Sequence, residues 1–290
     1  MAEDNQKPNG AGDITTYTPV PESDSIFSEY CLRSATVEFP TATNAEILFV
    51  NGMNNSPESH RRAALQLATI TGQNVVGIYN QTGITGNENI PNAIIDALQC
   101  VHDQLLPVGR AGDALAGLAA FQNPAGALSL LLARLSAGRF TPLRQAERLA
   151  GEAVLSLNRA SVALYNRLYD NANKRQRTIV VCHSQGNLIS ANAIWVLKRA
   201  RHWAKPVIGK VRLFGLASPT MSWPPNNEDG FKFSLYRDDR DLVTMLSIPG
   251  IGKKPFTHGG PGWDSSTHAI GNYFALQRFQ EDLARNLKRR

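Results

Sequence analysis

A serine stands where a buried strand is expected to turn into a helix. Residues 182–187 read Cys-His-Ser-Gln-Gly-Asn, follow the β-branched run 178–181 and lead into a helical pattern that continues to residue 194. A serine hydroxyl is a weak nucleophile near neutral pH. It therefore needs a strained turn that aims it at a histidine base, with backbone N–H groups nearby to receive an oxyanion. The pattern predicts that Ser184 is a nucleophile held at a strand-to-helix turn.

The sequence around Ser184 departs from Gly-x-Ser-x-Gly at its first position, where Cys182 replaces glycine. That position requires a small side chain, and cysteine is compact. Gly186 keeps the second close approach open between helix and strand. The plainer alternative is that Ser184 only caps a helix, since serine is a favoured N-cap residue. We favour the nucleophile because capping alone does not require this strand-to-helix crossing.

On these residues the chain resembles the α/β-hydrolases, in particular bacterial lipase-like members with a His-Ser-Gln-Gly turn at the nucleophile. The resemblance extends from about residue 47 to about residue 273. It implies a mostly parallel sheet flanked by helices, and a triad whose members follow in the order serine, acid, histidine. The partners of Ser184 should therefore lie C-terminal to it.

Asp241 is the acid that the resemblance implies. Lipase-like hydrolases commonly carry an Asp-x-Val step after a strand, and residues 241–243 read Asp-Leu-Val after the strand-like run 232–236. The acid accepts a hydrogen bond from the histidine, which fixes its tautomer and stabilises the imidazolium. Asp238 and Asp239, each beside an arginine, are the alternatives.

His268 is the predicted base, because it ends the polar loop 262–268 and the helical pattern behind it can fix its position. His258, in a Gly-Gly-Pro loop without such a helix, is the alternative. His183 adjoins the serine and is expected to shape the pocket rather than to accept its proton. The other three are expected to be surface or packing histidines: His60, His102 and His202.

Two backbone N–H groups are expected to form the oxyanion hole. One belongs to Gln185, the residue after the nucleophile. The other is carried over by the resemblance to Met53, because many relatives have His-Gly-x after the early strand where this chain has Asn51-Gly52-Met53 after the run 46–50. An ordinary Asn-Gly turn at the end of a strand has the same sequence, so that alternative stays open.

The elements that must position these residues alternate along the chain. Residues 1–25 are polar and rich in proline and glycine, which predicts a mobile N-terminal segment. The resemblance implies that residues 26–290 form the α/β-hydrolase domain. Helical patterns separate most of the strand-like runs, which predicts an α/β fold with a mostly parallel sheet. Those runs lie near 34–39, 46–50, 74–79, 178–182, 210–216 and 232–236.

A helical insertion is predicted over residues 106–150, because the gap between the third and fourth runs exceeds what a simple crossover needs. Its segment 114–133 has no charged residue but is interrupted by Pro124 and several glycines, so it reads as two short apolar helices rather than one spanning helix. Such a hairpin is either a lid over the active site or part of the core, and the sequence leaves both open.

Composition narrows the cofactors and partners. Three cysteines, Cys31, Cys100 and Cys182, lack metal-ligand spacing and are too few for a disulfide framework, so no metal, no cofactor and no structural disulfide is expected. The net charge of +6 and the basic tail 285–290 favour peripheral contact with an anionic membrane, although cations also suit a helix C-terminus. Nucleic-acid binding is not expected, because the basic residues lack aromatic interleaving. Oligomeric state stays open.

No signal peptide begins the sequence, so cytoplasmic synthesis is the default expectation, and export as an effector, known for some lipase-like proteins, is compatible with it. Together the residues predict a serine hydrolase that cleaves carboxylic esters of lipids or other acyl groups through a Ser-His-Asp triad and an acyl-enzyme. Two alternatives remain: an idle lipid-binding module on a hydrolase scaffold, and an acyltransferase or thioesterase.

Overall fold

The structure is a computed structural model that describes residues 5–21, 36–52, 55–81, 159–199, 210–218, 231–238, 241, 256–258 and 269–289. The predicted insertion at 106–150, Met53 and His268 lie outside the described residues, and so do the cysteines Cys31 and Cys100.

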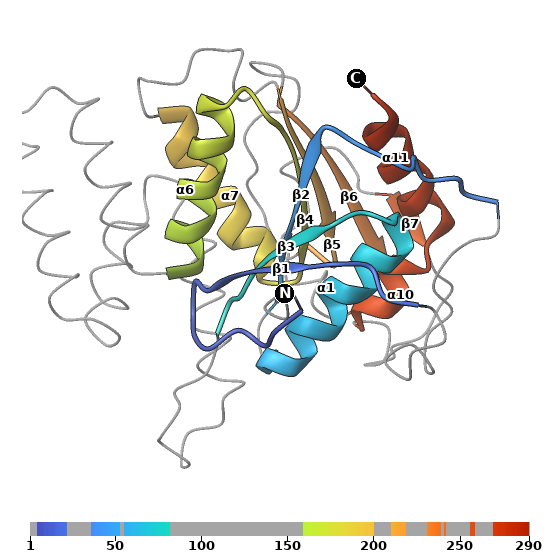
Figure 1. The fold of residues 1–290 in the computed structure, drawn as a ribbon, viewed down its shortest axis with the longest axis horizontal. Helices are drawn as coiled ribbons and strands as arrows, with labels where there is room; N and C mark the ends of the chain where they lie inside the picture. Colours follow the sequence, from blue (N-terminus) through green and yellow to red (C-terminus); the bar gives the residue numbers. More distant parts are fainter. Residues whose placement is uncertain are drawn as a thin grey trace, which may run out of the picture.

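Seven strands of the described residues form one sheet, in the order β1-β3-β2-β4-β5-β6-β7 (Figure 1). The strands from β3 to β7 in this order pair in parallel, whereas β1 pairs antiparallel with β3. This confirms the predicted mostly parallel sheet. The bounds are β1 (Ile14–Tyr17), β2 (Ala45–Val50), β3 (Val75–Ile78), β4 (Arg177–His183), β5 (Val211–Leu216), β6 (Lys232–Asp238) and β7 (Phe256–His258).

Helices cover both faces of the sheet. On one side lie α6 (Arg159–Asn173) and α7 (Gly186–Arg199), and on the other lie α1 (Pro57–Thr71), α10 (Ile270–Phe274) and α11 (Gln277–Lys288) (Figure 1). Within the ranges described, no helix has the length and apolar character to cross a membrane.

Burial on both faces explains the continuous apolar runs of the central strands. Successive side chains of a strand point to opposite faces. Phe49 and Val181 accordingly belong to the core cluster beside α1 and α11, while Leu48 and Val180 belong to the cluster beside α6 and α7. A parallel sheet covered on both sides therefore favours apolar residues at every position.

The N-terminal prediction is wrong for residues 14–17, which form β1 instead of part of a mobile segment. Ile14 lies opposite Ile78 in the ladder, and Tyr17 is fully buried. The strand-like run 34–39 is also wrong in its described part, because residues 36–39 lie outside any strand. The short β1 occupies the free edge of β3, so that edge is closed to another strand.

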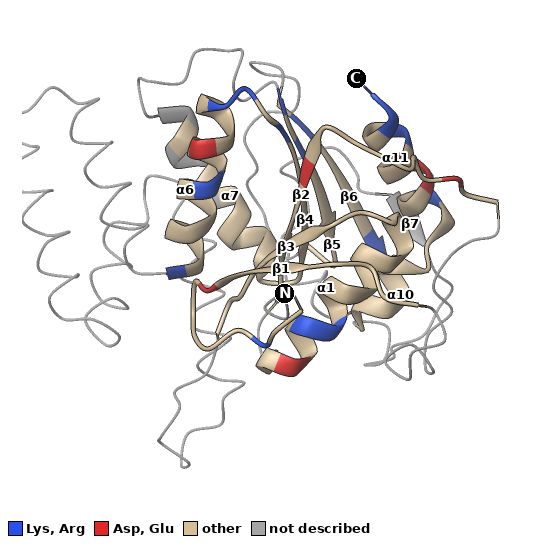
Figure 2. Cartoon of the chain, in the orientation of Figure 1, with Lys and Arg blue, Asp and Glu red and all other residues tan. Residues whose placement is uncertain are grey.

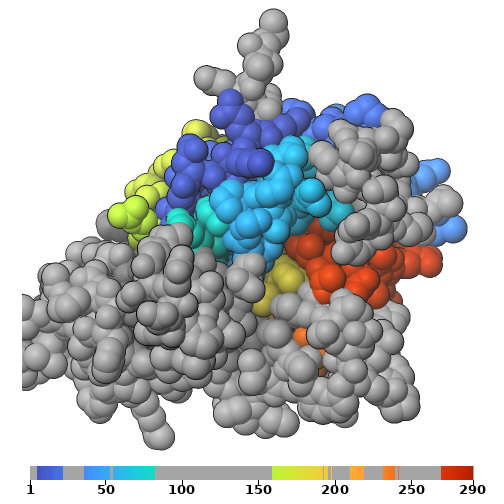
Figure 3. Space-filling model, turned by 90° about the horizontal axis from the view of Figure 1, so that it is seen from below, coloured from blue at the N-terminus to red at the C-terminus, as the bar shows by residue number. Residues whose placement is uncertain are grey.

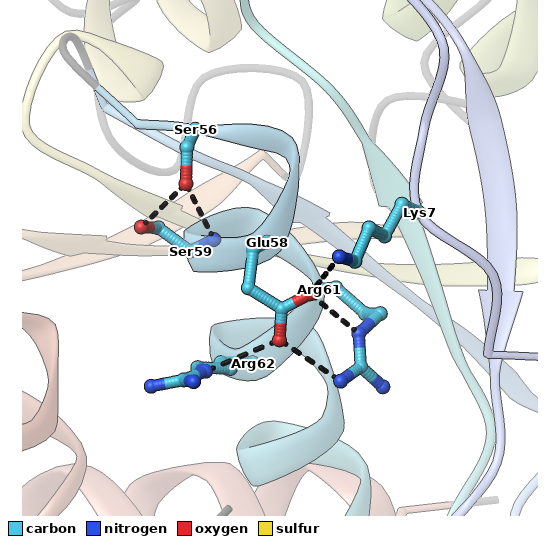
Figure 4. A network of polar contacts seen from close by, with 6 residues as sticks. All are labelled: Lys7, Ser56, Glu58, Ser59, Arg61 and Arg62. Carbon is cyan, nitrogen blue, oxygen red and sulfur yellow. Dashed lines mark hydrogen bonds and ion pairs between the residues drawn. The ribbon is translucent and has the colours of Figure 1, made fainter.

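Helix α1 has well-defined ends. Ser56 is its N-cap, with extended backbone and a side chain that accepts from the Ser59 N–H at 3.1 Å, and the helix ends at Gly72, whose φ is 66°. Glu58 in the first turn binds Lys7, Arg61 and Arg62 (Figure 4). The hydrogen bond from Arg61 lowers the pKa of Glu58 to about 2. This cluster attaches the N-terminal segment to α1.

Candidate active site

Ser184 lies between β4 and α7 with a φ of 53°. The strand and helix on its two sides confirm the predicted strand-to-helix turn. A residue other than glycine rarely adopts positive φ, and it keeps this conformation only where its surroundings impose it. Ordinary N-caps have extended backbone, as Ser56 does with a φ of −68° and a ψ of 160°. The backbone of Ser184 therefore differs from that of a simple cap.

Two glycines allow the chain to crowd against this turn. A Cβ on Gly186 would lie 2.4 Å from the carbonyl oxygen of Val50, and a Cβ on Gly52 would lie 2.5 Å from the Cβ of Ser184. Only glycine fits at such approaches. The loop after β2 and the first turn of α7 thus meet directly at Ser184, which is 1% exposed.

The side chain of Asn187 stabilises the turn through hydrogen bonds, a role that was not predicted from the sequence. Its Nδ2 donates to the carbonyl oxygens of Ser184 and Leu216, both at 2.9 Å. Its Oδ1 accepts from the Sγ of Cys182 at 3.4 Å. Burial raises the pKa of the Cys182 thiol, so the thiol remains a neutral donor. The cysteine that replaces glycine in the motif therefore contributes a contact of its own.

The side chain of Asn51, after β2, makes hydrogen bonds through both of its polar atoms. Its Nδ2 donates to the carbonyl oxygens of Gly52 and Asn80, both at 2.8 Å. Its Oδ1 accepts from the Asn80 N–H at 2.7 Å and contacts Nδ1 of His60 at 2.8 Å. A carboxamide has two donor hydrogens and two acceptor lone pairs. Asn51 is therefore saturated by protein groups and holds the loop after β2 in place.

His60, from α1, supports Asn51 and is wholly buried. Because Asn51 Oδ1 accepts, His60 Nδ1 carries the proton, and Nε2 has no hydrogen-bond partner among the described residues. The rings of Tyr17, Phe49 and Tyr79 surround the imidazole at centroid distances of 5.4 to 5.8 Å. This burial lowers the pKa of His60 to about 3, so the ring is neutral at physiological pH. The expectation of a packing histidine is confirmed.

Gln185, the residue after the serine, is fixed through its side chain. Its Oε1 accepts from Nδ2 of Asn80 at 2.9 Å, and the residue is fully buried. Asn80 follows β3 and also contacts Asn51, so a continuous polar network joins His60 to Gln185. Gln185 also lies at the N-terminus of α7, where the helix dipole favours negative charge.

Asp241 lies three residues after the end of β6 and is fully buried. Its Oδ2 accepts from the hydroxyl of Tyr273 at 2.7 Å, and its N–H donates to the carbonyl of Asp238 at 3.0 Å. The Asp238 N–H donates in turn to the Tyr273 oxygen at 3.2 Å. Burial and the neighbouring carboxylate of Asp241 raise the pKa of Tyr273, so its hydroxyl stays a donor.

Strand order fixes the spacing between the nucleophile and the acid. Ser184 follows β4 and Asp241 follows β6, with β5 between them, at the same end of the sheet. Two inter-strand spacings amount to about 10 Å, a gap that one imidazole with its two hydrogen bonds can fill. In a view onto this end, atoms of α7 are visible where α1 meets the segment of α10 and α11 (Figure 3).

Tyr273 connects the two sides of that gap. Besides its bond to Asp241, its ring packs edge-on against the buried ring of His183 at 5.9 Å. It belongs to α10, whose N-cap is Ala269, the residue after His268 in the chain. His258 lies in β7, opposite Asp238, which corrects its assignment to a loop. Asp239, His102 and His202 lie outside the described residues.

Comparison of the chain with models of known families, with curated proteins and with solved structures gave no match. The chemistry of the site is therefore argued from its geometry. That geometry combines a serine with left-handed backbone, a glycine-bearing loop against it, and a buried carboxylate two strands away.

Proposed function

We propose that this protein is a serine hydrolase on an α/β-hydrolase fold that cleaves carboxylic esters of lipids or other acyl groups. The positive φ of Ser184 between β4 and α7 is the observation that carries the proposal, because a nucleophile on a sharp strand-to-helix turn has this backbone. The buried Asp241 after β6 supports it, since an acid in that position follows the serine in the order the fold requires.

In the proposed reaction the Ser184 oxygen attacks the ester carbonyl while His268 accepts the serine proton. Asp241 orients His268 and stabilises the imidazolium. The N–H groups of Gln185 and Met53 hold the oxyanion of the tetrahedral intermediate. Its collapse expels the alcohol, which takes the proton from His268, and water activated by His268 then releases the acid and restores Ser184.

The hydrogen bonds of the Asn51 side chain indicate that the loop after β2 has a structural role and does not contact the substrate through this side chain. Since both polar atoms of the side chain are bound to Gly52, Asn80 and His60, the side chain does not replace the histidine of related loops as a substrate contact. It holds the loop against Ser184 instead. The oxyanion is accordingly assigned to backbone donors, which a rigid loop can position without reorganisation.

Labelling with a fluorophosphonate tests the proposal directly, because this probe reacts with activated serines. We expect the native chain to be labelled, with detergent or lipid present to open any lid, and Ser184→Ala and His268→Ala to remain unlabelled. Ser190→Ala, which changes another buried serine in the adjoining helix α7, should label like the native chain. If the native chain is not labelled although its circular dichroism spectrum shows that it is folded, the proposal is overturned in favour of an idle scaffold.

Product analysis then separates hydrolysis from acyl transfer. In the presence of p-nitrophenyl esters and a competing alcohol or thiol, a hydrolase releases free acid as its main product. Predominant formation of the new ester or thioester would assign the chain to acyl transfer, which uses the same triad.

A further inference from the structure

A cavity lies at the opposite end of the sheet from Ser184, under the last turns of α11. Its volume is about 210 Å³, and β5, β6 and α11 supply its described walls. It is smaller than the roughly 300–1,000 Å³ of pockets for drug-sized ligands. The residues that matter for its chemistry are Arg212, Lys232, Ser234, Asp282, Arg285 and Arg289.

The register of the strands groups the cations on one face. Arg212 of β5 is the ladder partner of Lys232 of β6. Side chains two residues apart share a face. Arg212 therefore lies on the face of Phe214, which packs against α11 through Phe279 at a ring distance of 6.0 Å. Figure 2 shows basic residues gathered at this end of the sheet and of α11.

Arg177 of β4 belongs to the same group. Its guanidinium donates to the carbonyl oxygens of Asn286 and Arg289 at the end of α11. These contacts hold the C-terminal end of the helix over the sheet. Burial, together with the charge of Arg289, lowers the pKa of Arg177. The same two causes lower the pKa of Arg212, with Arg177 as a further contributor.

Positive charge exceeds negative charge among the described residues that line the cavity. Four of these are cations and one, Asp282, is a carboxylate. Asp282 accepts from Arg285 at 3.0 Å, from Arg278 at 3.4 Å and from the Tyr236 hydroxyl at 2.7 Å. Its charge is therefore shared between two arginines and balances only part of the group. Arg212 is the half-buried cation among these four, so water screens its repulsion from Arg289 and Arg177 only in part, and an anion relieves that repulsion.

We propose that this cavity is a binding site for a phosphate group, carried either by a small phosphorylated molecule or by a lipid headgroup. One guanidinium group can donate two parallel hydrogen bonds to the oxygens of a phosphate. A group of several cations should also bind a dianion such as phosphate more tightly than a monoanion such as acetate. The cavity is separate from the proposed site of ester cleavage. The Ser184 N–H binds the carbonyl of Leu216 at one end of β5, and Arg212 lies four residues, or roughly 13 Å, away along the same strand. The phosphate site does not rest on the proposed function.

Isothermal titration of the full chain with inorganic phosphate tests the site. We expect one phosphate per chain, with affinity lowered at least about tenfold in Arg212→Gln and in Lys232→Gln, as expected for a lost charge-assisted hydrogen bond. Lys232 is exposed, so its variant should fold normally. The control Arg62→Gln removes an exposed arginine of α1 and should leave the affinity unchanged. Equal binding of acetate, or unchanged affinity in both cavity variants, would overturn the proposal.

Vesicle flotation distinguishes the two sources of the phosphate. Binding to vesicles of phosphatidic acid in phosphatidylcholine, displaced by free phosphate and weakened in Lys232→Gln, would identify a lipid headgroup. Phosphate binding without such flotation would identify a small phosphorylated ligand. Flotation that Lys232→Gln and Arg212→Gln do not weaken, with no phosphate bound in titration, would refute the site. Fluorophosphonate labelling of the same variants should not change, which keeps this test independent of the triad.

Discussion

The side chain of Asn80 donates to Oε1 of Gln185 at 2.9 Å, across 105 positions of the sequence. This bond joins the end of β3 to the start of α7. Because Asn80 also binds Asn51 through its backbone N–H and carbonyl, it is the junction of the polar network beneath Ser184. The two proposed oxyanion donors therefore belong to segments that share one support.

Asn80→Ala should reduce ester turnover by roughly 10- to 100-fold with little change in KM, because a misplaced oxyanion donor weakens binding of the transition state and not of the substrate. The free energy of unfolding should fall by about 1–3 kcal/mol, since the buried Oε1 of Gln185 loses the hydrogen bond from Asn80. Asn171→Ala is the matched control: Asn171 is buried and donates at 3.0 Å to Thr178 near the start of β4, at the opposite end of that strand from Ser184. Equal loss of turnover in both variants would refute the positioning role.

Tyr273→Phe should lower turnover by a similar factor, because the phenol is the hydrogen-bond donor described for Asp241 Oδ2. The comparison is with Tyr236→Phe, which removes a hydroxyl that is bound at the same 2.7 Å to Asp282 and not to Asp241. Both variants should lose about 1–3 kcal/mol of unfolding free energy in urea titrations. Only the first should also change the pH dependence of kcat, as expected if Asp241 sets the pKa of the base.

Ser184→Gly should be more stable than Ser184→Ala by roughly 1 kcal/mol, because glycine adopts a φ of 53° without the steric penalty of a Cβ. Chemical denaturation of the two inactive variants measures the difference. The same pair of substitutions at Ser190, inside α7, should have the opposite order, since glycine destabilises a helix interior. If alanine is the more stable residue at both positions, Ser184 does not have the strained backbone described above.

Stability should fall as the pH is lowered below 6.5, owing to His60. Its pKa is about 3 when folded and 6.5 when unfolded, so the unfolded chain binds the additional proton between these values. As the pH falls through this window, the free energy of unfolding decreases by up to about 1.4 kcal/mol per pH unit. Above pH 6.5 the neutral His60 causes no such loss. The pKa of Glu58, lowered from 4.5 to about 2, adds a loss only below pH 4.5.

His60→Gln isolates this contribution, because glutamine keeps a donor for Asn51 but does not titrate. Urea titrations between pH 7 and pH 4.5 should give a shallower pH dependence for the variant than for the native chain. An identical pH dependence in the two proteins would show that His60 is not buried as a neutral ring.

Local sequence was sufficient to predict the central strands β2, β4 and β5, because they consist largely of apolar residues that are buried in the sheet. It also placed Ser184, Gln185 and Asp241 at strand ends. The strands β1 and β7, with four and three residues, are short and contain few apolar residues, whereas the equally short β3 is apolar and buried throughout. The polar run 34–39 has β-branched residues like a strand but finds no strand to pair with in its described part.

The supporting residues of the site could not be predicted in the same way. Asn80 and Gln185, or Tyr273 and Asp241, are brought together by the order of strands in the sheet, and neither pair has a characteristic spacing. Asn187 gave a weak signal as an amide in the first turn of a buried helix. His60 was expected to be a surface or packing histidine, and no sequence pattern links it to Asn51, which was expected in the oxyanion loop or in an Asn-Gly turn.

The antiparallel strand β1 has a consequence for the behaviour of the molecule in solution. Its residues 14–17 satisfy the backbone groups of β3, which would otherwise offer unpaired donors and acceptors of the apolar segment Val75–Ile78 to a neighbouring molecule. Removal of the first 21 residues would uncover that row and also the cavity left by Tyr17. The N-terminal segment thus protects the edge of the sheet from intermolecular strand pairing and aggregation.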